Sequence, residues 1–156
     1  MTGRITRPML RIVCFLLVAL GLIHGERAFA ATPEQAQAMA EKAAAYLEQN
    51  GPEKAFAAIE DRAGEFRDGD LYVFVHDSNG LVVAHGGYST LKGKNTIGLT
   101  DIDGKPFVRE MVSIKNTGWV AYKWQNPVSR ALEEKVVYVV REGPYLVCAG
   151  AYKSSP

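Results

Sequence analysis

The sequence predicts an α+β domain in which helices cover a sheet of five antiparallel strands, and three observations support this. Apolar residues recur at helical spacing from Ala36 to Leu47. From Asp70 onward the pattern changes to short runs rich in β-branched and aromatic residues, separated by Gly, Asn and Pro. One amphipathic segment, which begins at Pro106, interrupts these runs after the second. Helices followed by strands are typical of α+β domains, in which helices lie on an antiparallel sheet.

The N-terminal helical region begins with a strong capping signal. Thr32 is a good N-cap, Pro33 suits the first helical position, and Gln35 is placed to complete a capping box. Asn50-Gly51 is a typical helix end, and Pro52 suits the start of a further helix. The predicted helices run from Pro33 to about Gln49 and from Pro52 to near Arg62.

The strands follow from alternation and turn residues. Asp77-Ser78-Asn79-Gly80 separates the first two runs and predicts a β-hairpin. A glycine-containing loop then leads to the crossover helix, which is expected from Pro106 to about Lys115. The last three strands have short connections and should form an antiparallel meander. The five predicted strands are Leu71–His76, Leu81–His85, Trp119–Trp124, Lys135–Arg141 and Tyr145–Tyr152.

The first thirty residues have the pattern of a signal peptide. Three arginines precede an apolar run from Ile12 to Ile23, and Ala28-Phe29-Ala30 is a small-x-small cleavage motif. We expect cleavage after Ala30 and a periplasmic or secreted protein. The alternative is a retained membrane anchor, although the apolar run is shorter than the roughly 20 residues that span a bilayer.

Composition limits the function of residues 31–154, which have the length of one domain. We expect helices over 31–67 and the sheet over 68–154. After removal of residues 1–30 the chain has 14 Lys and Arg against 16 Asp and Glu, a net charge of −2. Without a basic stripe, nucleic acid is not an expected partner. Cys148 is then the one remaining cysteine, and we expect it to be buried in a strand.

No motif in the sequence predicts an enzyme, a cofactor or a metal site. The loop from Gly93 to Gly98 has phosphate-loop spacing, but Leu99 stands where lysine is required. Asp101-Ile102-Asp103-Gly104 resembles the start of a calcium loop, but its glycine comes too early, and a turn is the preferred interpretation. The remaining acids and bases are isolated.

Several stretches together resemble the single Cache domain in its type 2 form. They are Tyr72–Asp77, Gly80–His85, Gly93-Lys94-Asn95, Asp101–Lys105, Gly118–Pro127, Lys135 with Tyr138, and Ala149-Gly150-Ala151-Tyr152. The resemblance covers residues 33 to 153. It implies a PAS-like sheet behind a long N-terminal helix, with a pocket between the sheet and its cover. It also implies an extracytoplasmic sensor of small carboxylates or amino acids, here a free-standing member that signals through a separate receptor or histidine kinase.

Alternation along the strands selects candidate pocket residues. Tyr122 and Trp124 share one face of their strand, which we assign to the pocket, while Lys123 should lie outside unless it reaches a ligand at the sheet edge. His85 should share a face with Leu81 and Val83, either as a ligand contact or as an ordinary polar strand end. His76 precedes a turn and is expected to be solvated.

Other candidates come from the resemblance to the Cache family, which implies a carboxylate or amino-acid ligand. Arg109 is a possible bidentate partner or a solvated residue of the crossover helix. Lys135 is placed either in the pocket or at the sheet edge, and tyrosines 72, 138 and 152 either line the pocket or pack in the core. The ligand-binding residues that we predict are Tyr72, His85, Arg109, Tyr122, Trp124, Lys135 and Tyr138.

Two functions remain open from the sequence. The first is an extracytoplasmic sensor domain that binds a small organic ligand. The alternative is an interaction module with the same fold that forms a homodimer through the helix from Pro33 to Gln49.

Overall fold

The computed structural model describes residues 30–153, so most of the predicted signal peptide (residues 1–29) lies outside the described part of the chain. Among the described residues, no helix has the length and apolar character needed to cross a membrane. The elements, in chain order, are α1 (Pro33–Glu60), β1 (Arg67–Asp68), β2 (Leu71–Asp77), β3 (Val82–His85), the 3-10 helix η1 (Ser89–Leu91), α2 (Phe107–Ser113), β4 (Thr117–Gln125), β5 (Leu132–Glu142) and β6 (Tyr145–Tyr152).

Helix α1 begins with the predicted capping box. The Thr32 hydroxyl accepts a hydrogen bond from the Gln35 backbone, and the Gln35 side chain accepts one from the Thr32 backbone. Gly51 has φ +77°, which breaks the helical geometry just before Pro52. The two predicted helices are therefore two segments of one kinked element. The buried side of the first segment is mostly alanine, which lets the helix lie close to the sheet.

All strand pairs of the sheet are antiparallel, in the order β1-β2-β6-β5-β4, with β3 also paired to β2. The predicted hairpin of β2 with β3 and the predicted meander of β4, β5 and β6 are both confirmed. The sheet has six strands, not the five predicted, because the two-residue strand β1 also pairs with β2. Two residues are too few to show the alternation by which a strand is recognised in a sequence.

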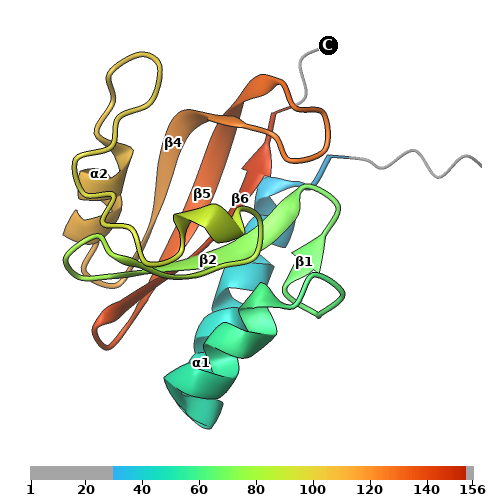
Figure 1. Cartoon of the computed structure of the whole chain (residues 1–156), viewed down its shortest axis with the longest axis vertical. Coiled ribbons are helices and arrows are strands. Elements are labelled where there is room, and N and C mark those ends of the chain that lie inside the picture. The colour runs from blue at the N-terminus through green and yellow to red at the C-terminus, as the bar shows by residue number, and fades with distance from the viewer. Residues whose placement is uncertain (1–29, 154–156) are drawn as a thin grey trace, which may run out of the picture.

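The two faces of the sheet are covered differently (Figure 1). Helix α1 packs on one face, where its alanines meet Val73, Val75 and Val147. On the other face the segment from Gly86 to Pro106, with η1 and α2, covers side chains that include Phe74, Tyr122 and Val137. This second face, with its looser cover of loop and short helices, contains the pocket described below.

Asp101 fastens the cover to the edge strand β4. Its Oδ1 accepts hydrogen bonds from the backbone N–H groups of Asp103 and Lys105, and its Oδ2 accepts one from the Lys123 backbone at 3.0 Å. Gly104 completes the turn with φ +81°. The segment from Asp101 to Gly104 is therefore a turn, as predicted. The hydrogen bond from Lys123 and those within the turn hold the pKa of Asp101 below its usual value.

We expect Asp101→Ala to lower the melting temperature at pH 7 by a few degrees, because three backbone donors lose their acceptor. A lowered folded-state pKa stabilises the fold above the unfolded-state pKa of about 3.9, and this contribution disappears as the pH falls further. The difference between wild type and variant should thus narrow toward pH 3. Thermal unfolding followed by circular dichroism at both pH values measures it.

Asp103→Ala is the matched control, because Asp103 makes only an exposed ion pair with Lys123, at 2.9 Å. Such pairs contribute little to stability. Equal effects of the two substitutions at pH 7 would contradict the role given to Asp101.

Candidate ligand-binding site

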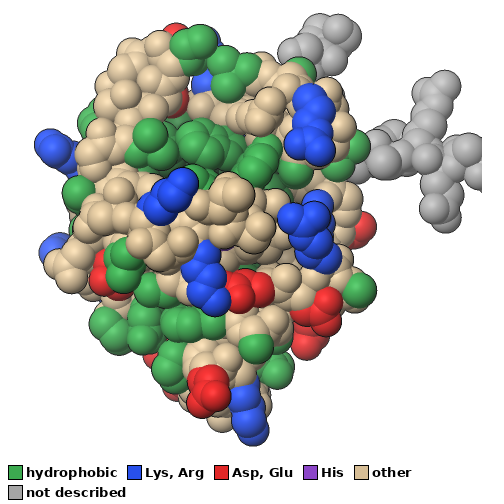
Figure 2. All heavy atoms as spheres, in the orientation of Figure 1, with side chains coloured by type: hydrophobic (Ala, Val, Ile, Leu, Met, Phe, Trp, Pro, Cys, Tyr) green, Lys and Arg blue, Asp and Glu red, His purple; other side chains and the backbone are tan. Residues whose placement is uncertain are grey.

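A pocket lies between the second face of the sheet and its cover. The roughly 320 Å³ of atom-free space in and around it includes open solvent, and about 20 Å³ of this space can take the centre of a water-sized molecule. Figure 2 shows hydrophobic side chains gathered in a recess on this side of the molecule, with Lys and Arg side chains near its rim. The lining residues are Tyr72, Phe74, His76, Val82, His85, Leu91, Thr96, Leu99, Phe107, Val108, Tyr122 and Trp124.

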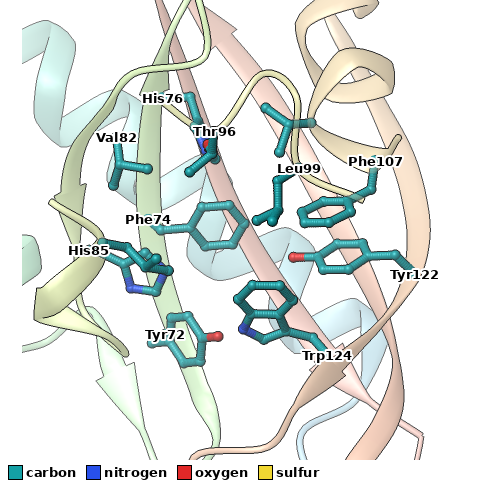
Figure 3. A pocket seen from close by; sticks show the side chains of 12 residues that line it. Tyr72, Phe74, His76, Val82, His85, Thr96, Leu99, Phe107, Tyr122 and Trp124 are labelled. Atoms are coloured by element: carbon teal, nitrogen blue, oxygen red, sulfur yellow. The ribbon is translucent and has the colours of Figure 1, made fainter. Parts of the chain in front are cut away.

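Aromatic rings from three elements form most of the wall (Figure 3). Phe107 of α2 stacks on Tyr122 of β4, with 4.0 Å between ring centroids and an angle of 6° between the planes. Trp124 meets Phe107 edge to face at 5.6 Å. Tyr122 and Trp124 lie on the pocket face as alternation predicts, and Lys123 points outward to Asp103. The stacked pairs fix the orientation of the rings.

Two polar groups of this wall are available to a ligand. The Tyr122 hydroxyl and the Trp124 indole N–H point toward the open space in Figure 3. Neither forms a hydrogen bond with any other residue in the 30–153 range. Burial raises the pKa of Tyr122 well above its ordinary value, so this hydroxyl stays protonated and acts as a donor.

His85 is held at the pocket by its own backbone neighbours. Its Nδ1 accepts hydrogen bonds from the backbone N–H groups of Gly87, at 3.1 Å, and Tyr88, at 2.8 Å. An accepting Nδ1 places the proton of the neutral ring on Nε2. Burial, together with Lys135 and His76, lowers the pKa of His85 to about 3, so the ring remains neutral near pH 7. Nε2–H is thus a fixed neutral donor.

The face predicted for His85 was partly wrong. Val75 pairs with Ala84 and His76 pairs with Val82, so Val83 is the extra residue of a β-bulge. The bulge puts Val82 on the pocket side with His85, while Val83 packs against the α1 side. Strict alternation, which would group His85 with Leu81 and Val83, fails at this point.

Lys135 lies beneath the wall and is fully buried. Its Nζ is 3.8 Å from the ring centroid of Tyr72, 4.8 Å from that of Tyr152 and 5.3 Å from that of Phe74. No acceptor in the described part of the chain takes a hydrogen bond from Nζ. Burial lowers the pKa of Lys135 to about 7, although the charge of Asp70 acts in the opposite direction. The sheet-edge alternative for Lys135 is therefore wrong.

The tyrosine hydroxyls next to Lys135 are bonded in a chain. Tyr152 donates to the backbone oxygen of Gln125 at 2.9 Å, and Tyr88 donates to the same oxygen at 2.7 Å. The Tyr72 and Tyr152 hydroxyls are 3.1 Å apart, so Tyr72 donates to Tyr152. Desolvation raises the pKa of Tyr72, and both hydroxyls stay neutral. This chain fixes Tyr72 and Tyr152 around the Lys135 amine.

Three predicted site residues do not line the pocket: Lys135, which lies behind its wall, Tyr138 and Arg109. Tyr138 packs on the opposite face of the sheet, against Trp119, with 4.8 Å between ring centroids. It cannot share a face with Lys135, three residues away on β5, because side chains alternate along a strand. Arg109 is exposed on α2, and its Nε donates to the Ile97 backbone oxygen at 3.3 Å. Arg109 is exposed because a different side of α2 packs on the sheet.

His76 was expected to be solvated, and this was wrong. It is buried, and its Nε2 lies 3.0 Å from the Thr96 hydroxyl of the cover. Burial lowers the pKa of His76 to about 4. Phe74 and His76 were missed as lining residues, although alternation along β2 from Tyr72 identifies both. What the local pattern cannot show is that the segment around Thr96 folds back over this strand end.

Among the described residues, the remaining reactive groups do not gather into a metal site. Cys148 is buried in β6, as predicted, and burial raises the pKa of its thiol. Within residues 30–153, no three His, Cys, Asp or Glu side chains converge as metal ligands. The pocket is therefore an aromatic chamber with a few neutral donors, and the Lys135 amine is buried behind its wall.

An antiparallel sheet with a long helix on one face and an aromatic pocket under a loop cover defines the class of PAS-like sensor domains. Within this class, the chain belongs to the single Cache domain 2 family, whose sequence pattern matches residues 27–152. This is the type of sensor domain found in chemotaxis receptors and histidine kinases, and its family and fold are those of extracytoplasmic sensors and not of enzymes.

Known proteins agree with this assignment. The chain is 34% identical over 73 residues to the sensor histidine kinase MctS of Rhizobium johnstonii; the match covers 46% of this chain and 16% of the kinase. A methyl-accepting chemotaxis protein of Vibrio parahaemolyticus superposes with a TM-score of 0.65 at 20% identity, over 76% of this chain and 86% of that one.

Two further solved structures share the fold. The periplasmic sensor domain of a chemotaxis protein has a TM-score of 0.60 at 26% identity, over 78% of this chain and 90% of that one. A Cache chemosensory domain described for carboxylic acid recognition has a TM-score of 0.66 at 21% identity, over 78% of this chain and 92% of that one.

Proposed function

We propose that this domain binds a small monocarboxylate in the pocket and passes its occupancy to a separate receptor or histidine kinase. The observation that carries the proposal is Lys135, a fully buried amine without a hydrogen-bond partner among the described residues. A buried cation is costly unless it is paired. The ammonium over the Tyr72 and Tyr152 rings gains some cation–π energy, and the charge of Asp70 acts on it, but no anion in the described part of the chain is hydrogen-bonded to it.

The pocket lining narrows the ligand class further. None of its described residues is Asp or Glu, so the ammonium group of an amino acid would have no counter-charge there. The neutral donors of His85, Tyr122 and Trp124 suit the oxygens of a carboxylate. The carboxylic acid recognition described for a structural neighbour is consistent with this choice.

The alternative of a dimerisation module receives no support from α1. The apolar stripe that the sequence offers for a partner helix, from Ala36 to Leu47, is buried against the sheet of the same chain. A dimer through α1 would have to use its opposite, mostly polar side. Sedimentation of the exported protein would measure the oligomeric state directly.

Isothermal titration of the exported protein with propionate, propionamide and L-alanine tests the proposal. Propionate should bind, while propionamide, which has the same shape but no charge, and L-alanine, which adds an ammonium group, should bind at least about tenfold more weakly. Equal binding of propionate and propionamide would exclude the proposed role of the charge. If acetate, propionate and lactate all fail to bind, the ligand class is wrong.

We expect binding of propionate to weaken above neutral pH. Propionate pairs with the ammonium form of Lys135, whose pKa in the ligand-free protein is about 7. The affinity should therefore be nearly constant up to about pH 6, decline through pH 7, and fall by up to about tenfold per pH unit well above the pKa. His76 and His85 stay neutral throughout, because their pKa values are about 4 and about 3. Titrations at pH 6, 7, 8 and 9 measure the profile, and a flat profile would contradict the pairing with Lys135.

His85→Asn tests the Nε2–H donor of this histidine separately from its Nδ1 acceptor. The asparagine oxygen can replace Nδ1 as the acceptor for Gly87 and Tyr88, but the Nε2–H donor is lost. We expect the affinity for propionate to fall by about tenfold with little change in melting temperature, since a hydrogen bond to a charged group contributes about 1.5–3 kcal/mol. His85→Ala, which removes both groups, should also lower the melting temperature. Wild-type affinity in His85→Asn would remove His85 from the site.

A further inference from the structure

Asp70 is a buried carboxylate that has no cation in direct contact among the described residues, although its charge acts at longer range on the Lys135 amine. It lies at the start of β2, and 8% of its surface is exposed. Its Oδ2 accepts a hydrogen bond from the Asn126 side-chain amide at 3.1 Å, and its Oδ1 accepts one from the Ala31 backbone nitrogen at 3.4 Å. The ion pairs formed within residues 30–153 do not include Asp70. Buried charges normally have an opposite charge beside them.

The Ala31 nitrogen is held in a fixed place beside Asp70. Ala31 immediately precedes the N-cap Thr32, whose capping box defines the start of α1. The Ala31 side chain packs partly buried against the core cluster under α1. The neighbouring peptide bond, between Ala30 and Ala31, is the one that follows the small-x-small motif Ala28-Phe29-Ala30.

We propose that cleavage after Ala30 gives Asp70 a cation in direct contact: the new α-ammonium group of Ala31 forms an ion pair with Asp70. A signal peptidase adds water across the Ala30–Ala31 bond, so that Ala30 leaves with a carboxylate and Ala31 keeps the amine, which takes up a proton at neutral pH. The neutral N–H that lies 3.4 Å from Oδ1 in the uncleaved chain thus becomes a cation at the same position. Processing would then complete the fold as well as release the domain.

This ion pair would link the start of α1 to the pocket side of the sheet. Asn126, which donates to Asp70, also donates to Glu133 at 2.9 Å and accepts from the backbone of Val128, so it organises the turn between β4 and β5. The preceding residue, Gln125, offers the oxygen that binds the Tyr88 and Tyr152 hydroxyls. The proposal concerns stability after processing and holds whatever ligand the pocket takes.

The test uses the full chain exported from a bacterial host. Intact mass and N-terminal sequencing should identify Ala31 as the first residue. Inserting Ser-Gly between Ala30 and Ala31 then moves the new amine two residues away from Asp70. We expect this insertion to lower the melting temperature by about 3 °C or more. A first residue other than Ala31 in the wild type would overturn the proposal.

Asp70→Asn, introduced into both the wild type and the insertion variant, isolates the contribution of the ion pair between Asp70 and the Ala31 amine. It should lower the melting temperature of the processed protein, but leave it nearly unchanged in the insertion variant, where the α-amine no longer lies beside Asp70. Asp68→Asn, an exposed acid in β1, is the matched control and should have the same small effect in both. Equal effects of Asp70→Asn in the two backgrounds would overturn the proposal.

Amine reactivity gives a second measurement that does not require the Asp70 variant to fold. Acetylation of the processed protein by a limiting amount of acetic anhydride, located by mass spectrometry, should modify the Ala31 α-amine several-fold more slowly than the displaced α-amine of the insertion variant. Equal rates would show that the amine is free, and the ion pair would be excluded.

Discussion

Replacing Lys135 by Met is expected to abolish carboxylate binding and, at the same time, to make the ligand-free domain more stable. The affinity for propionate should fall at least about 30-fold, because a buried carboxylate would lose its cationic partner, a change that costs about 2–5 kcal/mol in comparable pairs. Titration calorimetry measures the first effect and thermal unfolding the second.

The gain in stability follows from the direction of the pKa shift. Burial lowers the pKa of Lys135 from 10.5 to about 7, so between these values the unfolded chain binds more protons than the folded one. Stability of the wild type therefore rises with pH across this range, and at or below pH 7 the domain bears the full cost of the buried amine, at most about 5 kcal/mol. Lys135→Met removes this cost along with the pH dependence.

Lys123→Met is the matched control, because Lys123 lies on the outer face of the neighbouring strand β4 and makes only an exposed ion pair with Asp103. Lys123→Met should leave the affinity for propionate unchanged and should change the stability only slightly. If Lys135→Met binds propionate within threefold of wild type, Lys135 is a core residue and the proposed ligand site is wrong.

The second large effect is expected at Gly150, which makes room for Lys135. A Cβ at this position of β6 would lie 2.6 Å from Lys135 Cε and 2.5 Å from Val137 Cγ2. Gly150→Ala should therefore destabilise the fold by about 1–3 kcal/mol, the usual cost of overpacking a core. It should also displace the Lys135 amine and weaken propionate binding by at least about tenfold.

Gly98→Ala provides the comparison, because a Cβ there meets nothing within 4 Å and the residue does not have positive φ. Its stability and affinity should stay close to wild type. A Gly150→Ala protein with wild-type melting temperature and affinity would show that Lys135 can be accommodated in another way, and the explanation of this glycine would fail.

The proposed sensor explains why the pocket combines rigid aromatic rings with a single charge. Stacked Phe107 and Tyr122 and the hydroxyl chain of Tyr72 and Tyr152 hold the donors in place before a ligand arrives. Little ordering then remains to be done on binding. Phe107 belongs to α2 and Tyr88 to the cover, so a ligand in the pocket would contact the face of the sheet opposite α1.

Local sequence signals determined much of the fold. The capping box at Thr32, the break at Gly51, the β2–β3 hairpin and the limits of β6 all depend on neighbouring residues, and the structure confirms each. The position of Tyr122 and Trp124 on one face also follows from alternation alone. These features are local because capping, turns and side-chain alternation are set by backbone geometry within a few residues.

Tertiary structure decided which polar residues face the pocket and what surrounds them. His76 is buried because a segment twenty residues later folds over it, and His85 turns inward because a bulge removes Val83 from the pairing. Lys135 is buried because a glycine on the adjacent strand leaves space for its side chain. Burial and charge partners depend on residues that are distant in the chain, so a single sequence names the candidates, whereas packing determines which of them can bind a ligand.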